Sequence, residues 1–195
     1  MSTAIAETTA LDLSVVQPAD IIVTRSSSNG SRVIRGGTCG VYSHAILALR
    51  DGKCIEAMPE TGVSIRPLKR ALDDSSYAAL YRHKLIDSEY ATWVCHHAKK
   101  QNGKKYDMQG AMRSGVATGC GGILKGSKLG FAVQLFDDLS KTGGRHSEKF
   151  FCSELIAYAF QKAALPLFKA QPHEATPSKI TYSDKLALIE ELITA

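Results

Sequence analysis

The 195-residue sequence has neither long hydrophobic runs nor a recognisable export signal. No apolar stretch approaches the roughly 20 residues that a membrane-spanning helix needs, so we expect no transmembrane segment. The first residues, MSTAIAETTALDL, carry Glu7 and Asp12 and lack the basic start and apolar run of a secretory signal. We therefore expect synthesis in the cytoplasm. Action in the periplasm or envelope of a target cell would then require a specialised secretion system.

The cysteine spacing follows no familiar framework. The five cysteines are an odd number, and their spacings do not suggest a set of disulfides. Soft metal ligands are present, but none are paired at C-x2-C or H-x3-H spacing, which disfavours a zinc site. These ligands are Cys39, His44, Cys54, Cys95, His96 and His97. We expect neither a metal nor a cofactor.

The chain also lacks a coherent basic stripe. Its net charge is +5, and the densest basic group has no interleaved aromatic residues, which favours a solvated helix end over a nucleic-acid surface. That group is Lys99, Lys100, Lys104 and Lys105. A weak attraction to anionic surfaces stays open. The segment GGILKGSK has Ser127 before Lys128, the reverse of a phosphate-binding loop, and no strand precedes it.

What is present is the composition of an ordinary globular domain, with 44% hydrophobic and 22% charged residues. We expect a single domain of α+β class, with a small antiparallel sheet followed by helices. The predicted strands are 20–25, 44–49, 53–57, 63–68 and 79–84, and a helix is predicted over 88–102. Residues 1–17 are predicted to be a loose leader and 173–180 a loop, while the type of 184–192 stays open.

Residues 108–147 differ in character from the rest and predict an insertion or lid. Residues 114–130 are rich in glycine, and 129–139 have apolar residues at helical spacing. Such a stretch suits either a lid or an interfacial contact with lipid.

The stretch KFFCSELIAYAF places Cys152 at the start of an apolar helix. Apolar residues follow it at i+3, i+4, i+7, i+8 and i+11, which is the stripe of a helix facing a core. A thiol in the first turn experiences the positive end of the helix dipole, which favours the thiolate. A small buried core cysteine is the alternative interpretation.

A thiolate nucleophile needs a base, and His44 begins the strand HAILAL. A third polar group must fix the imidazole, and Glu56 lies twelve residues further on, in the next predicted strand. A carboxylate in an apolar strand requires a partner, because unpaired buried charge is costly.

Five segments together carry a resemblance: DIIVTR, SHAILAL with IEAMPETGVSIRPL, GKKYD, FFCSELIAYAF and TPSKI. They resemble the circularly permuted branch of the NlpC-type papain-like superfamily, above all its YiiX/YebB-like group. Lecithin–retinol acyltransferase is a more distant relative with the same order of parts. The resemblance covers about residues 18–84 and 103–182.

This resemblance implies a papain-like core with Cys152 as nucleophile, His44 as base and Glu56 as orienting residue. It implies a cysteine hydrolase that cleaves amide bonds of bacterial cell-wall peptides, with delivery as an antibacterial effector as one family habit. An immunity protein or secretion machinery would then be a partner. A lipid acyl hydrolase or acyltransferase, and a binding module without activity, are the alternatives.

Four further residues are candidates for substrate binding or support. Tyr106 can supply a hydroxyl or pack in the core, and Glu154 can pair with a basic residue or complement the helix dipole. The other two are Tyr42, just before His44, and Ser153.

The turn between the strands of His44 and Glu56 decides whether these residues can meet. A two-residue turn at Asp51-Gly52 pairs Leu47 with Glu56, which puts Glu56 and His44 on opposite faces. A three-residue loop, or a bulge of equal effect, pairs Ile46 with Glu56 and brings the carboxylate within reach of the imidazole. We predict the second arrangement, with Gly52 in the left-handed conformation and a Glu56–His44 hydrogen bond.

Overall fold

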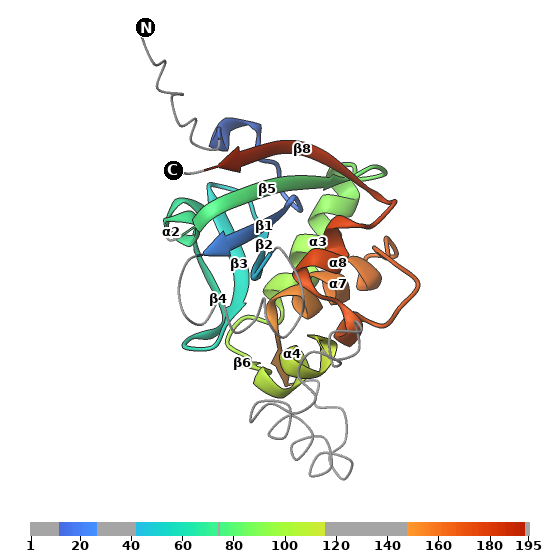
Figure 1. Ribbon diagram of the computed structural model, residues 1–195. Helices are drawn as coiled ribbons and strands as arrows, with labels where there is room; N and C mark the ends of the chain where they lie inside the picture. Colours follow the sequence, from blue (N-terminus) through green and yellow to red (C-terminus); the bar gives the residue numbers. More distant parts are fainter. Residues whose placement is uncertain (1–11, 27–41, 74, 116–147, 194–195) are drawn as a thin grey trace, which may run out of the picture.

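A computed structural model of the chain describes residues 12–26, 42–73, 75–115 and 148–193. An antiparallel six-stranded sheet has the order β4-β3-β2-β1-β5-β8 (Figure 1). Its strands are β1 (Ile21–Ser26), β2 (His44–Ala48), β3 (Lys53–Met58), β4 (Gly62–Pro67), β5 (Ser75–His83) and β8 (Leu186–Ile193). The helices are η1 (Leu13–Val15), α2 (Leu68–Leu72), α3 (Ser88–Lys99), α4 (Met108–Gly115), α7 (Cys152–Lys162), η3 (Pro172–Glu174) and α8 (Pro177–Thr181).

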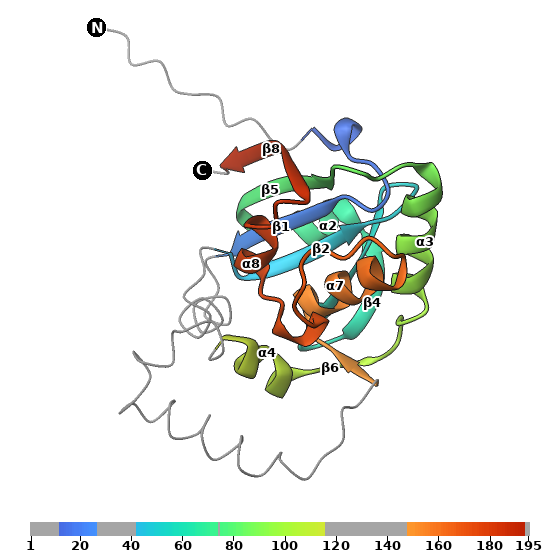
Figure 2. The same cartoon turned by 90° about the vertical axis from the view of Figure 1, so that its right-hand side faces the viewer.

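Both faces of the sheet are covered, but unequally. The larger core joins one face to α3 and α7, and includes Val23, Leu47, Val94 and Ile156. The smaller core joins the other face to α2. Figure 2 shows α7 in front of the sheet and α2 behind it. The expected α+β class is confirmed, and α7 buries the apolar stripe that the sequence predicted behind Cys152.

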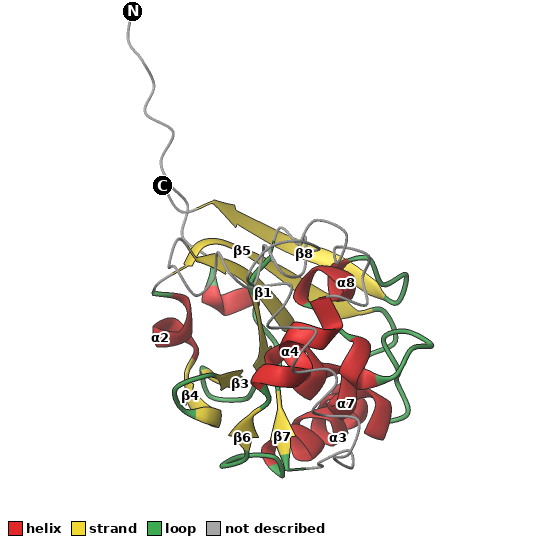
Figure 3. Ribbon diagram, turned by 60° about the horizontal axis from the view of Figure 1, so that its bottom comes forward, coloured by secondary structure: helices red, strands yellow, loops and turns green. Residues whose placement is uncertain are grey.

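A short parallel pair joins the two ends of the predicted insertion. Strand β6 (Lys105–Tyr106) pairs with β7 (Lys149–Phe150), and α7 begins two residues after β7 (Figure 3). Tyr106 and Phe150 therefore lie side by side although they are far apart in the sequence. Of the predicted insertion 108–147, α4 is described; residues 116–147, including the expected helix over 129–139, lie outside the described residues.

Gly62 fixes this region to the sheet. Its φ is +69°, and a Cβ there would lie 2.3 Å from the carbonyl oxygen of Lys104. The neighbouring Val63 N–H donates to that same carbonyl at 2.8 Å. A side chain at this position is therefore disfavoured both by the backbone conformation and by lack of space.

Several predicted boundaries are wrong for identifiable reasons. The strand predicted over 63–68 ends at Pro67, and α2 follows it. The predicted loop 173–180 contains α8, whose start is capped by the Thr176 hydroxyl accepting from the Lys179 N–H at 3.0 Å. Threonine followed by proline is a recognisable helix start that the interpretation as a loop overlooked. The helix predicted over 88–102 ends at Lys99, the strand predicted over 79–84 begins at Ser75, and the undecided segment 184–192 forms β8.

Candidate active site

Cys152 is the first residue of α7, and its side chain points into the molecule. The residue is 4% exposed. Phe151 precedes the helix in an extended conformation. As in any α-helix, the N–H groups of the first turn have no carbonyl partners within the helix. The position combines burial with the positive end of a helix of eleven residues.

His44 is the first residue of β2, at the end of the sheet where α7 begins. Its Nε2 lies 2.5 Å from Oε2 of Glu56. The imidazole also hydrogen-bonds the Cys152 side chain. Since Nε2 is engaged by Glu56, Nδ1 is the ring nitrogen left for the sulfur. The three predicted residues thus form one continuous chain of contacts.

The β2–β3 hairpin has the predicted register. Leu47 pairs with Ile55 and Ala48 with Cys54, so the next step places Ile46 opposite Glu56. The Leu49 N–H donates to the Lys53 carbonyl at 2.8 Å, which leaves three residues, 50–52, outside the ladder. Gly52 has φ +63°, as predicted. Asp51 has φ +59°, so the tip contains two left-handed residues. The predicted hydrogen bond and loop are both confirmed.

The electrostatics favour a charged cysteine–histidine pair. Burial raises the pKa of the Cys152 thiol, but the neighbouring His44 and the backbone N–H groups of Ala45 and Ser153 outweigh it and lower that pKa. Burial would lower the pKa of His44, but the negative charges of Cys152 and Glu56 and the hydrogen bonds to both raise it well above its usual value. Thiolate and imidazolium are therefore the favoured forms together.

Arg66 is a member of this cluster that sequence reasoning missed. It forms an ion pair through Nε with Oε1 of Glu56, whose side chain has no exposed surface. Burial tends to raise the pKa of Glu56, whereas His44 and Arg66 lower it below its usual range. The signal was present in the segment VSIRPL. Working out the β3–β4 register as well would have placed Arg66 on the face of Glu56.

Two of the four supporting candidates lie close to the cysteine. Burial raises the pKa of Tyr106, and the negative charge of Cys152 raises it further. The phenol therefore keeps its proton and can donate a hydrogen bond. Glu154 accepts from the Phe151 N–H at 3.4 Å, and burial, with a smaller contribution from Asp107, raises its pKa to about 7. That contact matches the interpretation of Glu154 as a carboxylate at a helix start.

The other two candidates have contacts elsewhere. The Ser153 hydroxyl donates to the Ala175 carbonyl at 3.0 Å, which ties α7 to the turn after η3. Tyr42 packs against Tyr77 with ring centroids 5.7 Å apart, and its hydroxyl is hydrogen-bonded to the tyrosines of β5. Ser153 therefore reaches the triad only through its backbone N–H, which hydrogen-bonds Cys152, and the recorded contacts of Tyr42 do not include a triad residue.

The described residues offer neither a metal-ion cluster nor a membrane-spanning helix. No cluster of three or more histidine, cysteine or acidic side chains suited to a metal ion occurs in that part of the chain. Cys54, Cys95 and Cys152 are free thiols there, while Cys39 and Cys120 lie outside it. Among these same residues, no helix combines the length and apolarity needed to span a membrane.

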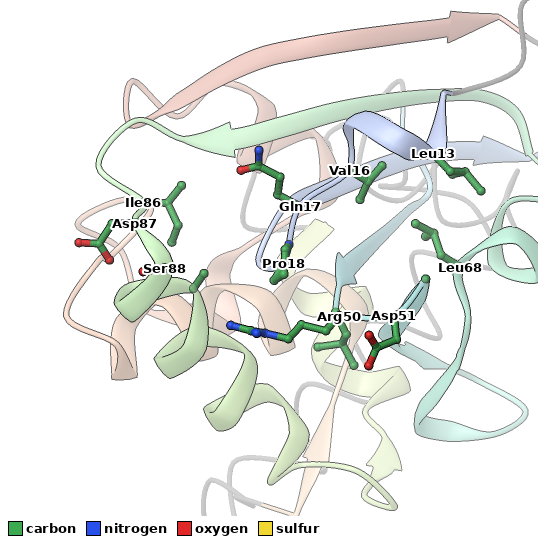
Figure 4. Close-up of a pocket in the computed structure, with 13 residues that line it drawn as sticks. Leu13, Val16, Gln17, Pro18, Arg50, Asp51, Leu68, Ile86, Asp87 and Ser88 are labelled. Atoms are coloured by element: carbon green, nitrogen blue, oxygen red, sulfur yellow. The ribbon is translucent and has the colours of Figure 1, made fainter.

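A groove of about 590 Å³ lies at the other end of β2 (Figure 4). It is bounded by η1, the β2–β3 hairpin tip and the start of α3, with Leu13, Arg50 and Ser88 in its wall. None of the three triad residues lines it. This groove and the reactive side chains therefore lie at different ends of β2.

The chain is similar to a curated protein and to a solved structure. No known family model matches the chain. The chain is 28% identical over 185 residues to the probable lipoprotein peptidase YaeF of Escherichia coli K12, covering 91% of this chain and 66% of YaeF. The chain therefore spans just under two thirds of that relative's length. The crystal structure of the metalloprotein yiiX from Escherichia coli O157:H7 superposes with a TM-score of 0.63 at 17% identity. That match covers 90% of this chain and 97% of yiiX, so the two share a fold and the resemblance to the YiiX/YebB-like group is supported.

Proposed function

We propose that this chain is a cysteine hydrolase in which Cys152 is the nucleophile, His44 the base and Glu56 the residue that orients the imidazole. The observation that carries the proposal is the unbroken chain of contacts from thiol to imidazole to buried carboxylate. A structural cysteine in a core requires neither of the other two groups.

The order of the three residues supports a circularly permuted papain-like fold. In papain the cysteine precedes the histidine by more than a hundred residues. Here His44 and Glu56 precede Cys152, so the order is reversed, and the buried Glu56 takes the imidazole-orienting place that an asparagine has in papain.

The reaction proceeds through a thioester. The Cys152 thiolate attacks the carbonyl carbon, and the first-turn N–H groups of α7 hold the oxygen as it becomes negative. The imidazolium of His44 gives its proton to the departing amine as the carbon–nitrogen bond breaks. His44 then takes a proton from water, whose oxygen attacks the thioester and releases the carboxylic acid and the thiolate. Glu56 stabilises the imidazolium whenever it is charged.

Amide bonds of bacterial cell-wall peptides are the substrate class that we propose, and the cell envelope is the proposed place of action. The relative named as a probable lipoprotein peptidase supports cleavage of peptide bonds and a place in the envelope. Hydrolysis of lipid acyl esters is the competing substrate class, because a thioester intermediate serves both reactions.

The test is to incubate the full chain with purified peptidoglycan and, separately, with mixed phospholipid vesicles, and to analyse the products by mass spectrometry. We expect new amine and carboxylate ends in the peptides, absent with Cys152→Ala. Cys95→Ala is the matched control, since Cys95 is another buried free thiol and lies on α3. If lysophospholipid forms while the peptides stay intact, the substrate class is lipid acyl esters. If products still form with Cys152→Ala, the proposed mechanism is refuted.

A further inference from the structure

Glu56 is a buried carboxylate held from two sides. One oxygen contacts His44 at 2.5 Å, and the other is ion-paired with Arg66. A cysteine–histidine–carboxylate triad requires only the first of these contacts. The second contact therefore needs its own explanation.

The β3–β4 register explains how Arg66 reaches the carboxylate. Cys54 pairs with Arg66, and Glu56 pairs with Ser64. Glu56 and Cys54 are two residues apart on one strand and share a face, so Arg66 lies diagonally across from Glu56 on that face. The Arg66 side chain is 38% exposed, so the guanidinium bridges from the buried carboxylate to solvent.

We propose that Arg66 is a positioning residue for the reactive cysteine, because it keeps Glu56 ionised through every stage of the reaction. This inference rests on the proposed function. His44 alone cannot keep Glu56 ionised, since it loses its positive charge when it protonates the leaving group. A buried carboxylate beside a neutral imidazole favours the protonated form. The guanidinium remains charged at all relevant pH values and supplies a constant partner.

The charged and titratable groups around the site determine whether loss of the Arg66 charge raises or lowers the pH at which the Cys152 thiolate forms. Glu56 faces His44 on β2, Arg66 on β4 and the thiol of Cys54 on its own strand. Cys152 faces His44 and the phenol of Tyr106 on β6. Two carboxylates lie near the start of α7, Glu154 on the helix itself and Asp107 between β6 and α4.

Removing the positive charge of Arg66 raises the pKa of Glu56, and a protonated Glu56 no longer supports the imidazolium. The thiolate then lacks its counter-charge and forms only at higher pH. Since an opposite charge nearby lowers a carboxyl pKa by about 1–3 units, we expect the pH at which the thiolate appears to rise by about one unit.

The experiment measures the rate at which iodoacetamide alkylates Cys152 in the full chain between pH 4 and pH 10 (a range chosen to span roughly the ordinary carboxyl and thiol values), with the modified peptide identified by mass spectrometry. Arg66→Gln should shift the acid limb of this profile upward by about one pH unit. Arg66→Lys keeps the charge and should shift it less. Arg66→Ala is a second uncharged variant in case the glutamine form does not fold.

The matched control is Arg82→Gln. Arg82 makes two contacts of 2.7 Å with the buried Asp20, at the far end of the sheet from His44. This variant should lower the melting temperature and leave the acid limb in place. If Arg66 had only a structural role, its uncharged variants would also melt at a lower temperature and keep the acid limb of wild type.

Two results would overturn the inference: acid limbs of the uncharged Arg66 variants that coincide with wild type, or equal shifts for lysine and glutamine. A wild-type profile with no acid limb below the ordinary thiol pKa is a different failure. That result would show that Cys152 is not paired with His44 as a thiolate, and it would overturn the proposed function itself.

Discussion

Replacing Glu56 by glutamine is the sharpest single perturbation of the proposed triad. The amide has nearly the same shape as the carboxylate and keeps an oxygen, but it has no charge. The side chain is completely buried and lies 2.5 Å from His44, so no water can take over the missing charge without rearrangement. Arg66 loses its partner as well but is partly exposed, so its charge can be solvated.

The size of the effect follows from the charge that is lost. Two unit charges about 4 Å apart interact by about 4 kcal/mol at an effective dielectric constant of 20. Because Arg66 already neutralises part of the Glu56 charge, we take roughly 3 kcal/mol as the loss of imidazolium stabilisation. That energy corresponds to a decrease of about 100-fold in kcat/KM.

The assay measures kcat/KM for the cell-wall peptide whose cleavage mass spectrometry has identified, together with the melting temperature of each variant. The pKa of Glu56 is lowered on folding, so its stabilising contribution is present above the unfolded value of 4.5 and is lost as pH falls through the folded value. Glu56→Gln should therefore melt below wild type at pH 7, and the difference should shrink in acid.

Glu191→Gln serves as the control. Glu191 lies on β8 and accepts an exposed hydrogen bond of 2.7 Å from the Tyr77 hydroxyl, so it should be dispensable for activity. Glu56→Gln with kcat/KM within about threefold of wild type, equivalent to less than 1 kcal/mol, would remove Glu56 from the triad.

Three further outcomes are expected. A thiol-reactive probe should label Cys152 well before Cys95, because burial raises the pKa of Cys95 whereas His44 lowers that of Cys152; faster labelling of Cys95, by peptide mapping, would contradict the assignment. Gly62→Ala should cost roughly 1–3 kcal/mol in denaturant unfolding, because the added methyl group meets a backbone carbonyl at positive φ; an unchanged midpoint would count against the close approach. Ser153→Ala should cost about 1 kcal/mol and leave probe labelling intact, since its hydroxyl ties α7 to the η3 turn; loss of labelling with normal stability would give Ser153 a part in the site.

The sequence by itself determined the elements that carry the chemistry. The stripe behind Cys152 is a property of helical periodicity, which a buried helix of this length expresses directly. The register between His44 and Glu56 followed from one short loop, because a side-chain period of two leaves only two possible faces. The apolar stripe is a local property of one helix, and the register depends on a single turn.

Tertiary structure alone decided which distant groups surround that pair. The ion pair of Arg66 with Glu56 depends on a second hairpin register and on complete burial of the carboxylate. Tyr42 lies two residues before His44, yet its recorded contacts are with β5 and Ser178. Strand order and packing set these partners, and neighbouring positions in sequence carry no information about them. Charge coupling acts through space over a few ångströms, so the ionisation of the site was fixed only when the sheet and α7 came together.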